Sequence, residues 1–318
     1  MAQKGSSSNE NPIALIQPQG ECGSMSILPF HDRDGLIWFD GKLVPWRDAH
    51  IHVLTHGLHY ASCVFEGERI YDGKVFKLTE HSQRLGASAN LLDFKIPWSV
   101  AEIDQATRDT IAANRMVDGY VRPVAWRGSE MMGVSAQNSV IHLAIAVWVW
   151  PSYFPMEMRM KGIRLQLADW RRPAPNTAPT QSKAAGLYMI CTIAKHKAER
   201  EGYQDALMLD WRENIAEATG ANIFFTRDGK LHTPTPDCFL DGITRRSVIG
   251  LAKARKIEVI ERHIKPDEMP TFDECFITGT AAEVTPVGCI GEHTFVPGSV
   301  CRTLMDDFEK LTRTKAAA

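Results

Sequence analysis

The sequence of 318 residues contains no apolar run long enough to cross a membrane. Its longest run, LAIAVWVW at residues 143–150, is far shorter than the roughly 20 residues that a membrane-spanning helix needs. An excess of charge of one sign is also absent, because 36 Lys and Arg residues stand against 38 Asp and Glu residues, for a net charge of −2. The sequence therefore predicts neither a membrane protein nor a protein that binds nucleic acid through its overall charge.

Two features of a secreted protein are also missing. The seven cysteines are odd in number and include no C-x-x-C pair, which predicts reduced thiols and a cytoplasmic protein. Residues 1–28 are rich in Ser, Asn, Gln and Pro, and their only apolar cluster, IALI, is too short for the core of a signal peptide. We expect a disordered extension over residues 1–30.

The first half of the chain carries clear turn and cap signals. Asp-Gly pairs at Asp40 and Asp72 each separate two apolar runs, which predicts two β-hairpins. Thr79 is the expected N-cap of one helix, and Ser99 with Glu102 forms the capping box expected of the next. The segments GYVRPVAWRG and SVIHLAIAVWVW then predict two buried strands.

A proline-containing segment, PSYFP at residues 151–155, interrupts this pattern and predicts a linker. Beyond it we expect a strand at GIRLQLADW, a meander from DALMLD to LHTP, a helix from GITRRSV and a last helix near residues 299–311. The prediction is an α/β protein of two domains, with mixed α+β character. Its expected parts are the extension at 1–30, a small domain at 31–148, a linker at 149–158 and a large domain at 159–318.

The segment PTQSKAAGLYMI places one lysine among small and apolar residues. After Lys183, apolar residues recur at helical spacing and predict a helix that begins close to it: Leu187, Tyr188, Ile190, Cys191 and Ala194. A cation at the positive end of a helix dipole is disfavoured by roughly 0.3–1 kcal/mol, which favours the neutral amine that attacks a carbonyl. A solvated lysine at a helix start is the simpler alternative, and this segment alone does not decide between them.

Two further segments suit a cofactor that carries a phosphate and a ring nitrogen. In GITRRSV, a glycine and Thr244 precede a helix, and the free N–H groups of a helix start bind anions. Glu217 lies among small and apolar residues, where a carboxylate needs a donor or cation such as a protonated ring nitrogen. The alternatives are an ordinary helix start and a solvated turn glutamate.

Several motifs together resemble one enzyme family. SKAAGLYM, EATGANIFF, LHTPTPDCFLDGITR and TGTAAEVTPV are similar to the class IV aminotransferases, which depend on pyridoxal phosphate and have fold type IV. Within that class, HGLHYASCVFEG, EHSQRL, GYVRPVAWRG and RRPAPNTAPTQSKAAGLY resemble branched-chain-amino-acid aminotransferases. The resemblance covers roughly Leu36 to Leu311 and departs from the pattern at Ala221, where many relatives have an acid, and in the variable loop EMMGV.

The resemblance implies pyridoxal 5'-phosphate as the cofactor and assigns the residues that would hold it. Lys183 corresponds to the lysine that forms the Schiff base and moves the proton. Tyr188 corresponds to the tyrosine that bonds the phenolic oxygen, and Glu217 to the partner of the ring nitrogen. The residues that match the phosphate site are Arg84, Ile243, Thr244 and Thr280.

The resemblance also assigns the substrate site. Tyr120 matches the α-carboxylate site together with the backbone of Thr280 and Ala281, and Arg122 matches the arginine that meets the second carboxylate of glutamate. The alternative for this arginine is a structural role on its strand, with its side chain tied to Glu66 or Glu68. The residues that match the walls of the side-chain pocket are Tyr60, Phe65, Val134, Trp150 and Tyr153.

The activity that this resemblance implies is transfer of the amino group of leucine, isoleucine or valine to 2-oxoglutarate, by a homodimer or homohexamer whose partners are small amino and 2-oxo acids. The alternatives are D-amino-acid transfer or chemistry of the aminodeoxychorismate lyase kind, and a non-catalytic cofactor-binding protein. A zinc site at His50, His52, His56 and His59 is a further alternative, disfavoured because no cysteine lies nearby at ligand spacing. We expect no metal.

Overall fold

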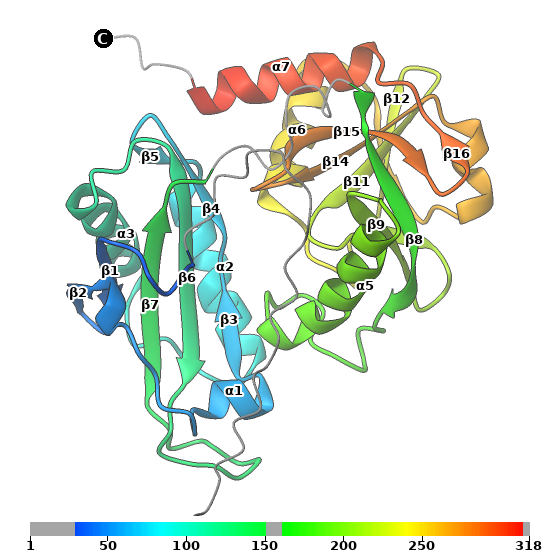
Figure 1. Ribbon diagram of the computed structural model, residues 1–318. Coiled ribbons are helices and arrows are strands. Elements are labelled where there is room, and N and C mark those ends of the chain that lie inside the picture. The colour runs from blue at the N-terminus through cyan, green and yellow to red at the C-terminus, as the bar shows by residue number, and fades with distance from the viewer. Residues whose placement is uncertain (1–28, 151–160, 314–318) are drawn as a thin grey trace, which may run out of the picture.

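The computed structural model describes residues 29–150 and 161–313, in which the chain forms two separate β-sheets, each with its own helices. Figure 1 shows the two sheets side by side, the first with its helices at the left and the second at the right. The predicted α/β fold with two domains is confirmed. No helix among the described residues is both long and apolar enough to span a membrane.

The first sheet is antiparallel and has the order β2-β1-β7-β6-β4-β5, with β3 paired to a second part of β6. Helices α2 and α3 cover one of its faces, where Val121, Leu143 and Ile145 are buried. Its strands are β1 (Leu36–Phe39), β2 (Lys42–Pro45), β3 (Cys63–Phe65), β4 (Glu68–Tyr71), β5 (Lys74–Val75), β6 (Gly119–Arg127) and β7 (Ile141–Trp148). Its helices are η1 (Trp46–Asp48), α1 (His56–Tyr60), α2 (Leu78–Leu91) and α3 (Val100–Ala113).

Most local predictions for this domain are confirmed. Asp40 and Asp72 have positive φ values of 45° and 49° and are each followed by a glycine of positive φ, as tight hairpin turns require. The Ser99 hydroxyl accepts the N–H of Glu102, and the Glu102 carboxylate accepts the N–H of Ser99. The prediction for Thr79 is wrong. Helix α2 already begins at Leu78, so Thr79 lies within its first turn, and the Thr79 hydroxyl donates to Asp104 at 2.6 Å.

The second sheet is mixed, with the order β10-β9-β8-β15-β14-β11-β12-β13 and β16 paired to β15. Its strands are β8 (Ile163–Arg172), β9 (Asp205–Asp210), β10 (Ile215–Ala218), β11 (Asn222–Arg227), β12 (Lys230–Pro234), β13 (Val259–Arg262), β14 (Glu274–Gly279), β15 (Glu283–Ile290) and β16 (His293–Thr294). Its helices are η2 (Ala185–Tyr188), α5 (Met189–Arg200), α6 (Ile243–Ala254), η3 (Pro266–Thr271) and α7 (Ser299–Arg313). The predicted meander and both predicted helices are present.

Two residues at the edges of the predicted parts pack into the small domain. Phe30, which lies in the range expected to be an extension, accepts the indole N–H of Trp46 at 2.7 Å and packs edge-on against Trp148. Trp150, which lies in the range expected to be a linker, packs against Tyr120 with 5.3 Å between ring centroids. The segment PSYFP lies outside the described residues.

Polar side-chain contacts join the two domains. Tyr71 of β4 donates to Glu283 of β15 at 2.8 Å, and Arg313 at the end of α7 lies 3.1 Å from Asp118. Figure 1 shows α7 along the top of the large domain, with its C-terminal end directed toward the small domain. The cavity described next also takes residues from both domains.

Candidate active site

A cavity with an empty volume of about 590 Å³, part of it open to solvent, surrounds Lys183. Most of its wall comes from the large domain, and Arg84 on α2 comes from the small domain. This one cavity brings together all seven predicted cofactor residues: Arg84, Lys183, Tyr188, Glu217, Ile243, Thr244 and Thr280. Residues from α2, η2, β10 and α6 and from two connecting segments thus meet at one place.

Lys183 lies in an extended segment that the small domain holds by its backbone. Its N–H donates to the Ser88 hydroxyl at 2.9 Å, and its carbonyl accepts the N–H of Phe65 at 3.2 Å. The predicted position at the mouth of a helix is wrong in detail, because a 3₁₀ turn intervenes and α5 begins only at Met189. The helix dipole is therefore not the main reason for any change in the lysine's basicity.

Burial is the main reason instead. Removal from water, followed by the positive charge of Arg84, lowers the pKa of Lys183 to about 8. The Lys183 amine donates to the Tyr188 hydroxyl at 2.7 Å, and burial together with the charge of Glu217 raises the pKa of that hydroxyl. A much larger fraction of Lys183 is thus a neutral amine at neutral pH than for an ordinary lysine.

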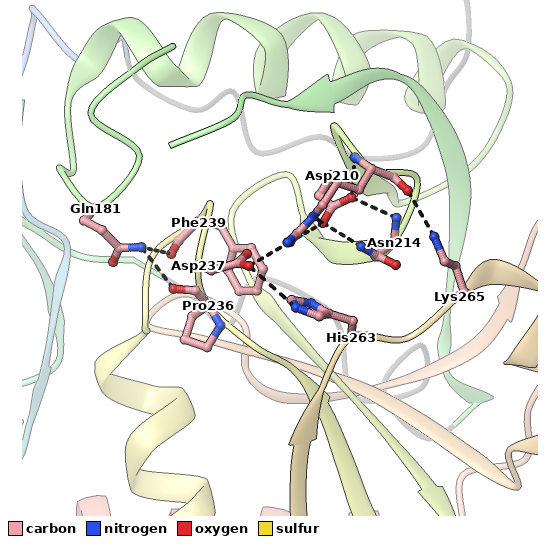
Figure 2. A network of polar contacts seen from close by, with 9 residues as sticks. Gln181, Asp210, Asn214, Pro236, Asp237, Phe239, His263 and Lys265 are labelled. Carbon is pink, nitrogen blue, oxygen red and sulfur yellow. Dashed lines mark hydrogen bonds and ion pairs between the residues drawn. The ribbon is translucent and has the colours of Figure 1, made fainter. Parts of the chain in front are cut away.

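The loop before Lys183 is fixed to the loop that leads into α6. Gln181 donates to the carbonyls of Pro236 at 3.0 Å and Phe239 at 3.2 Å. Figure 2 shows these bonds beside a second group of contacts, in which an arginine joins Asp237 to Asp210. That arginine is Arg212, which lies 2.7 Å from Asp237 and 2.8 Å from Asp210. The lysine loop and the α6 loop are therefore held in one position relative to each other.

Glu217 on β10 has two polar neighbours at moderate distance. The Asn222 amide donates to Glu217 Oε2 at 3.3 Å, and Arg172 Nε lies 3.4 Å from Glu217 Oε1. Burial raises the pKa of Glu217 to about 7, against the opposing charges of Arg172 and Lys183. Glu217 is not a solvated turn residue, since its side chain is only 12% exposed.

Arg172 is a site residue that the sequence analysis did not single out. It ends β8, its side chain is 4% exposed, and it lines the cavity beside Glu217. The available signal was a pair of arginines, Arg171 and Arg172, at the end of an apolar strand. Strand alternation puts neighbouring side chains on opposite faces, so one of the two had to turn inward.

The start of α6 forms the far wall of the cavity. Gly242 precedes Ile243 and Thr244, and a Cβ on Gly242 would stand 2.2 Å from Asn222 Oδ1. Only glycine therefore fits between Asn222 and the helix start. Thr278 lines the same wall, and its buried Oγ1 has no hydrogen-bond partner among the described residues. Free N–H groups at a helix start and an unpaired hydroxyl are the donors that a phosphate requires.

Arg84 approaches this wall from the small domain. Its Nε and Nη2 donate to the two carboxylate oxygens of the buried Glu66, at 2.6 and 2.8 Å. The third guanidinium nitrogen, Nη1, takes no part in these two bonds. The cavity thus offers a lysine amine, a carboxylate of raised pKa and a phosphate site, which is the donor set that pyridoxal phosphate needs.

The predicted substrate residues Tyr120, Arg122 and Phe65 lie together. The Arg122 guanidinium stands 4.7 Å from the Phe65 ring centroid and donates to the Tyr120 hydroxyl at 3.3 Å. The tie of Arg122 to Glu66 or Glu68 is not found, because Glu66 binds Arg84 and the Glu68 carboxyl has no hydrogen-bond partner among the described residues. Ala281 packs against the same aromatic cluster as Trp148 and Trp150, and that cluster includes Tyr120.

None of the predicted wall residues that the structure describes lines this cavity itself: Phe65 contacts Tyr188, and Trp150 packs against Tyr120. Tyr60 is 46% exposed, with its hydroxyl donating to the Met132 carbonyl, and Val134 is 84% exposed. Tyr153 lies outside the described residues. The predicted pocket for the substrate side chain is therefore only partly assembled by the described residues of one chain.

The four histidines do not gather around a common point. The buried His56 contacts the Ser62 hydroxyl and the Gly133 carbonyl at 3.0 Å each, and His59 contacts the Val53 carbonyl. Across residues 29–150 and 161–313, the one cluster of metal-ligand type is Asp210, Asp237 and Cys238, and Arg212 already pairs with both of its carboxylates. His56 thus has a structural role in holding the loop near Val134.

Comparison with known proteins agrees with this geometry. The family model described as amino-transferase class IV matches residues 63–290. The chain belongs to the class IV aminotransferases. A branched-chain-amino-acid aminotransferase of Pseudomonas aeruginosa is 42% identical over 260 residues, which cover 80% of this chain and 85% of that protein. The corresponding protein of Escherichia coli K12 is 41% identical over 257 residues, which cover 79% of this chain and 83% of that protein.

Solved structures of class IV aminotransferases have the same fold. The branched-chain amino acid aminotransferase of Escherichia coli superimposes with a TM-score of 0.86 at 37% identity, covering 89% of this chain and 96% of that one. The branched-chain amino acid aminotransferase of Thermobaculum terrenum, solved in its PLP-form, gives a TM-score of 0.80 at 30% identity, covering 88% of this chain and 94% of that one. The chain is thus an aminotransferase, and a relative of the same fold binds pyridoxal phosphate.

Proposed function

We propose that this aminotransferase moves the amino group of leucine, isoleucine or valine to 2-oxoglutarate, with pyridoxal 5'-phosphate held at Lys183. The observation that carries the proposal is the meeting of Lys183, Glu217, Arg84 and the start of α6 around one cavity. The relatives reported above, at 41–42% identity, support the branched-chain substrate class.

Each donor in the cavity has a place on such a cofactor. Arg84, the start of α6 at Ile243 and Thr244, and Thr280 would hold the phosphate, and Tyr188 the phenolic oxygen. When bound, the cofactor supplies an aldehyde that accepts an amine and a ring that takes up the electrons left when the α-proton departs. Glu217 would pair with the protonated ring nitrogen. That cation would stabilise the anionic form of Glu217, which burial disfavours.

Lys183 is placed to move the proton. Its amine, with a pKa near 8, is mostly uncharged at slightly alkaline pH, so that it accepts the proton from the α-carbon of the amino acid. The hydrogen bond to Tyr188 at 2.7 Å directs the amine toward one side of the cavity. The Lys183 N–H donates to Ser88 and its carbonyl accepts from Phe65, and these two bonds fix the Lys183 Cα while the side chain moves.

Tyr120 and Arg122 would recognise the two kinds of substrate. Aliphatic side chains suit the ring of Phe65 and the neighbouring aromatic residues, whereas the second carboxylate of glutamate or 2-oxoglutarate needs a cation. Arg122 forms no ion pair within the described residues, and its buried Nε has no hydrogen-bond partner there. Its guanidinium is therefore available for a substrate carboxylate.

The experiment that tests this proposal is an amino-acid panel with 2-oxoglutarate as the acceptor. We expect glutamate formation from leucine, isoleucine and valine, and loss of the protein's visible absorption on adding any of them alone. The alternatives raised by the sequence make different predictions. Activity with D-alanine, or release of pyruvate from an aminodeoxychorismate-type substrate, would replace the branched-chain assignment.

We also propose a homodimer, or an assembly of dimers, in the cytoplasm. Residues on the uncovered face of the first sheet form an apolar groove that includes Ile37, Leu58, Val124 and Trp126. Arg122 and Ala185 also line this groove, so it reaches the segment of Lys183. A second copy in the groove would cover the exposed Tyr60 and Val134 and complete the substrate pocket. The six cysteines among the described residues are free thiols, in keeping with a reducing compartment.

The oligomer is tested with one charge placed in the groove. Leu58, which is 62% exposed on α1, would become aspartate, and sedimentation should then show dissociation with a parallel loss of activity. Leu311 on α7, which is 45% exposed, provides the control, because Leu311→Asp adds the same charge away from the groove. A wild-type monomer with full activity would exclude the shared site.

A further inference from the structure

The segment FEGE, Phe65–Glu68, lies on the small-domain side of the active site. The Phe65 ring lies edge-on to Tyr188 with 4.8 Å between centroids. Gly67 lies so close to the Tyr120 hydroxyl that a Cβ would stand 1.9 Å from that oxygen. Two residues of the segment thus contact assigned site residues through their rings or backbone, and its two buried glutamates have no assigned role.

Glu66 is fully buried and strongly bound. It accepts two hydrogen bonds from Arg84, at 2.6 and 2.8 Å, and a third contact from His81 Nδ1 at 2.7 Å. The charge of Arg84 and these hydrogen bonds hold the pKa of Glu66 well below its usual range in spite of its burial. Glu66 is therefore a carboxylate, and its two oxygens fix the plane of the guanidinium.

Glu68, two residues later, is equally buried, but its pKa is shifted in the opposite direction. Neither of its oxygens has a hydrogen-bond partner among the described residues. Burial and the charges of Glu66 and Asp104 hold the pKa of Glu68 well above its usual range. This direction favours the protonated form of Glu68, which glutamine matches closely in shape and charge.

We infer that Glu66 is a positioning residue for cofactor binding: its two-point contact holds the Arg84 guanidinium in the cavity wall, with Nη1 left for the phosphate. The inference rests on the proposed function, in which Arg84 binds that phosphate. An arginine side chain otherwise loses much rotational freedom when it binds a ligand, and a guanidinium already held in place avoids that loss. Glu66 also pairs with the positive charge of Arg84, which would be unfavourable to bury without a partner.

The test compares Glu66→Gln with its matched control Glu68→Gln in the full-length protein freed of cofactor. The affinity for pyridoxal 5'-phosphate and for pyridoxal, which lacks the phosphate, is measured by absorption titration. We expect Glu66→Gln to weaken pyridoxal 5'-phosphate by about tenfold or more, as for the loss of one charge-assisted contact, and pyridoxal by less than about twofold. Glu68→Gln should change neither affinity.

Equal losses for both ligands in Glu66→Gln would show a general structural role and overturn the inference. No loss for either ligand, or the same phosphate-selective loss in Glu68→Gln, would also overturn it. If Glu66→Gln does not fold, Glu66→Asp takes its place, since it keeps the charge but is too short to contact both guanidinium nitrogens. A phosphate-selective loss in Glu66→Asp supports the inference, and equal losses for the two ligands reject it.

Arg84→Met separates this inference from the proposed function. If Arg84→Met leaves the affinity for pyridoxal 5'-phosphate unchanged, Arg84 does not bind the phosphate and the proposed site is wrong. If Arg84→Met weakens binding and Glu66→Gln does not, the proposed site stands and the positioning role of Glu66 alone is rejected.

Discussion

Two arginine–glutamate pairs border the same cavity from opposite domains, and they differ in geometry. In the small domain, Arg84 contacts both oxygens of Glu66, at 2.6 and 2.8 Å. In the large domain, Arg172 approaches Glu217 only through Nε, at 3.4 Å. Both glutamates are removed from water, so the difference between them comes from their partners, Arg84 and His81 for Glu66 and Arg172 for Glu217, and not from burial.

This difference in contact becomes a difference in charge. The pKa of Glu66 is held well below its usual range, whereas the pKa of Glu217 is raised to about 7. The two-point contact of Arg84, with the contact of His81, outweighs the cost of burial and gives a fixed anion. The looser contact of Arg172 leaves a carboxylate whose charge responds to its surroundings. The fixed pair suits holding a phosphate-binding arginine, and the responsive pair suits facing a ring nitrogen.

The largest effect is expected at Lys183, which is electrostatically coupled to both pairs. Arg84 lowers the pKa of Lys183, and Lys183 lowers the pKa of Glu217. Lys183→Ala should abolish the visible absorption of the bound cofactor and reduce turnover by a factor on the order of a thousand or more, while circular dichroism stays unchanged. A variant that still joins the cofactor covalently, seen by mass spectrometry after reduction, would show that Lys183 is wrongly assigned.

A smaller effect is expected at Arg122, which has no acidic partner among the described residues. Arg122→Leu should lower kcat/KM for the glutamate half-reaction by about ten- to a hundredfold, as for the loss of about 1.5–3 kcal/mol of charge-assisted bonding. The leucine half-reaction should fall far less. Single-turnover absorption changes with each donor provide the measurement, and equal losses for the two donors would return Arg122 to a structural role.

Glu217→Gln tests the responsive pair directly. It should leave cofactor affinity largely intact and slow removal of the α-proton by about tenfold or more, because a neutral amide stabilises a protonated ring less well. This is the reverse of the pattern expected for Glu66→Gln, which should act on affinity. An unchanged single-turnover rate with leucine would remove the proposed role of Glu217.

The smallest effect, a shift in pH dependence, is expected at Arg172. Arg172 lowers the pKa of Glu217, so its removal must raise that pKa above about 7 and reduce the anionic fraction at neutral pH. Arg172→Met should therefore move the acid limb of the kcat/KM profile to higher pH. Arg171→Met is the control, because Arg171 pairs with the exposed Glu213 at 2.8 Å, and its profile should match that of the wild type. A shift of the same size in both variants would show that the effect does not come from the contact between Arg172 and Glu217.

Much of the local structure followed from the sequence alone. The hairpins at Asp40 and Asp72 and the capping box of Ser99 and Glu102 were predictable because each depends on residues no more than a few positions apart. The family motifs likewise named Lys183 and Glu217 in advance. Such signals are local, or are repeated in each member of a family.

Tertiary structure decided the charges and partners within the site. The macrodipole argument for Lys183 failed because α5 begins six residues later, and burial beside Arg84 has the effect instead. Arg172 was not singled out because nothing in the strand sequence shows which of two adjacent arginines faces Glu217. The opposite pKa shifts of Glu66 and Glu68 depend on Arg84 of α2 and Asp104 of α3, which lie far from both glutamates in the sequence. Burial and long-range pairing set a group's charge, and both arise only when distant segments pack together.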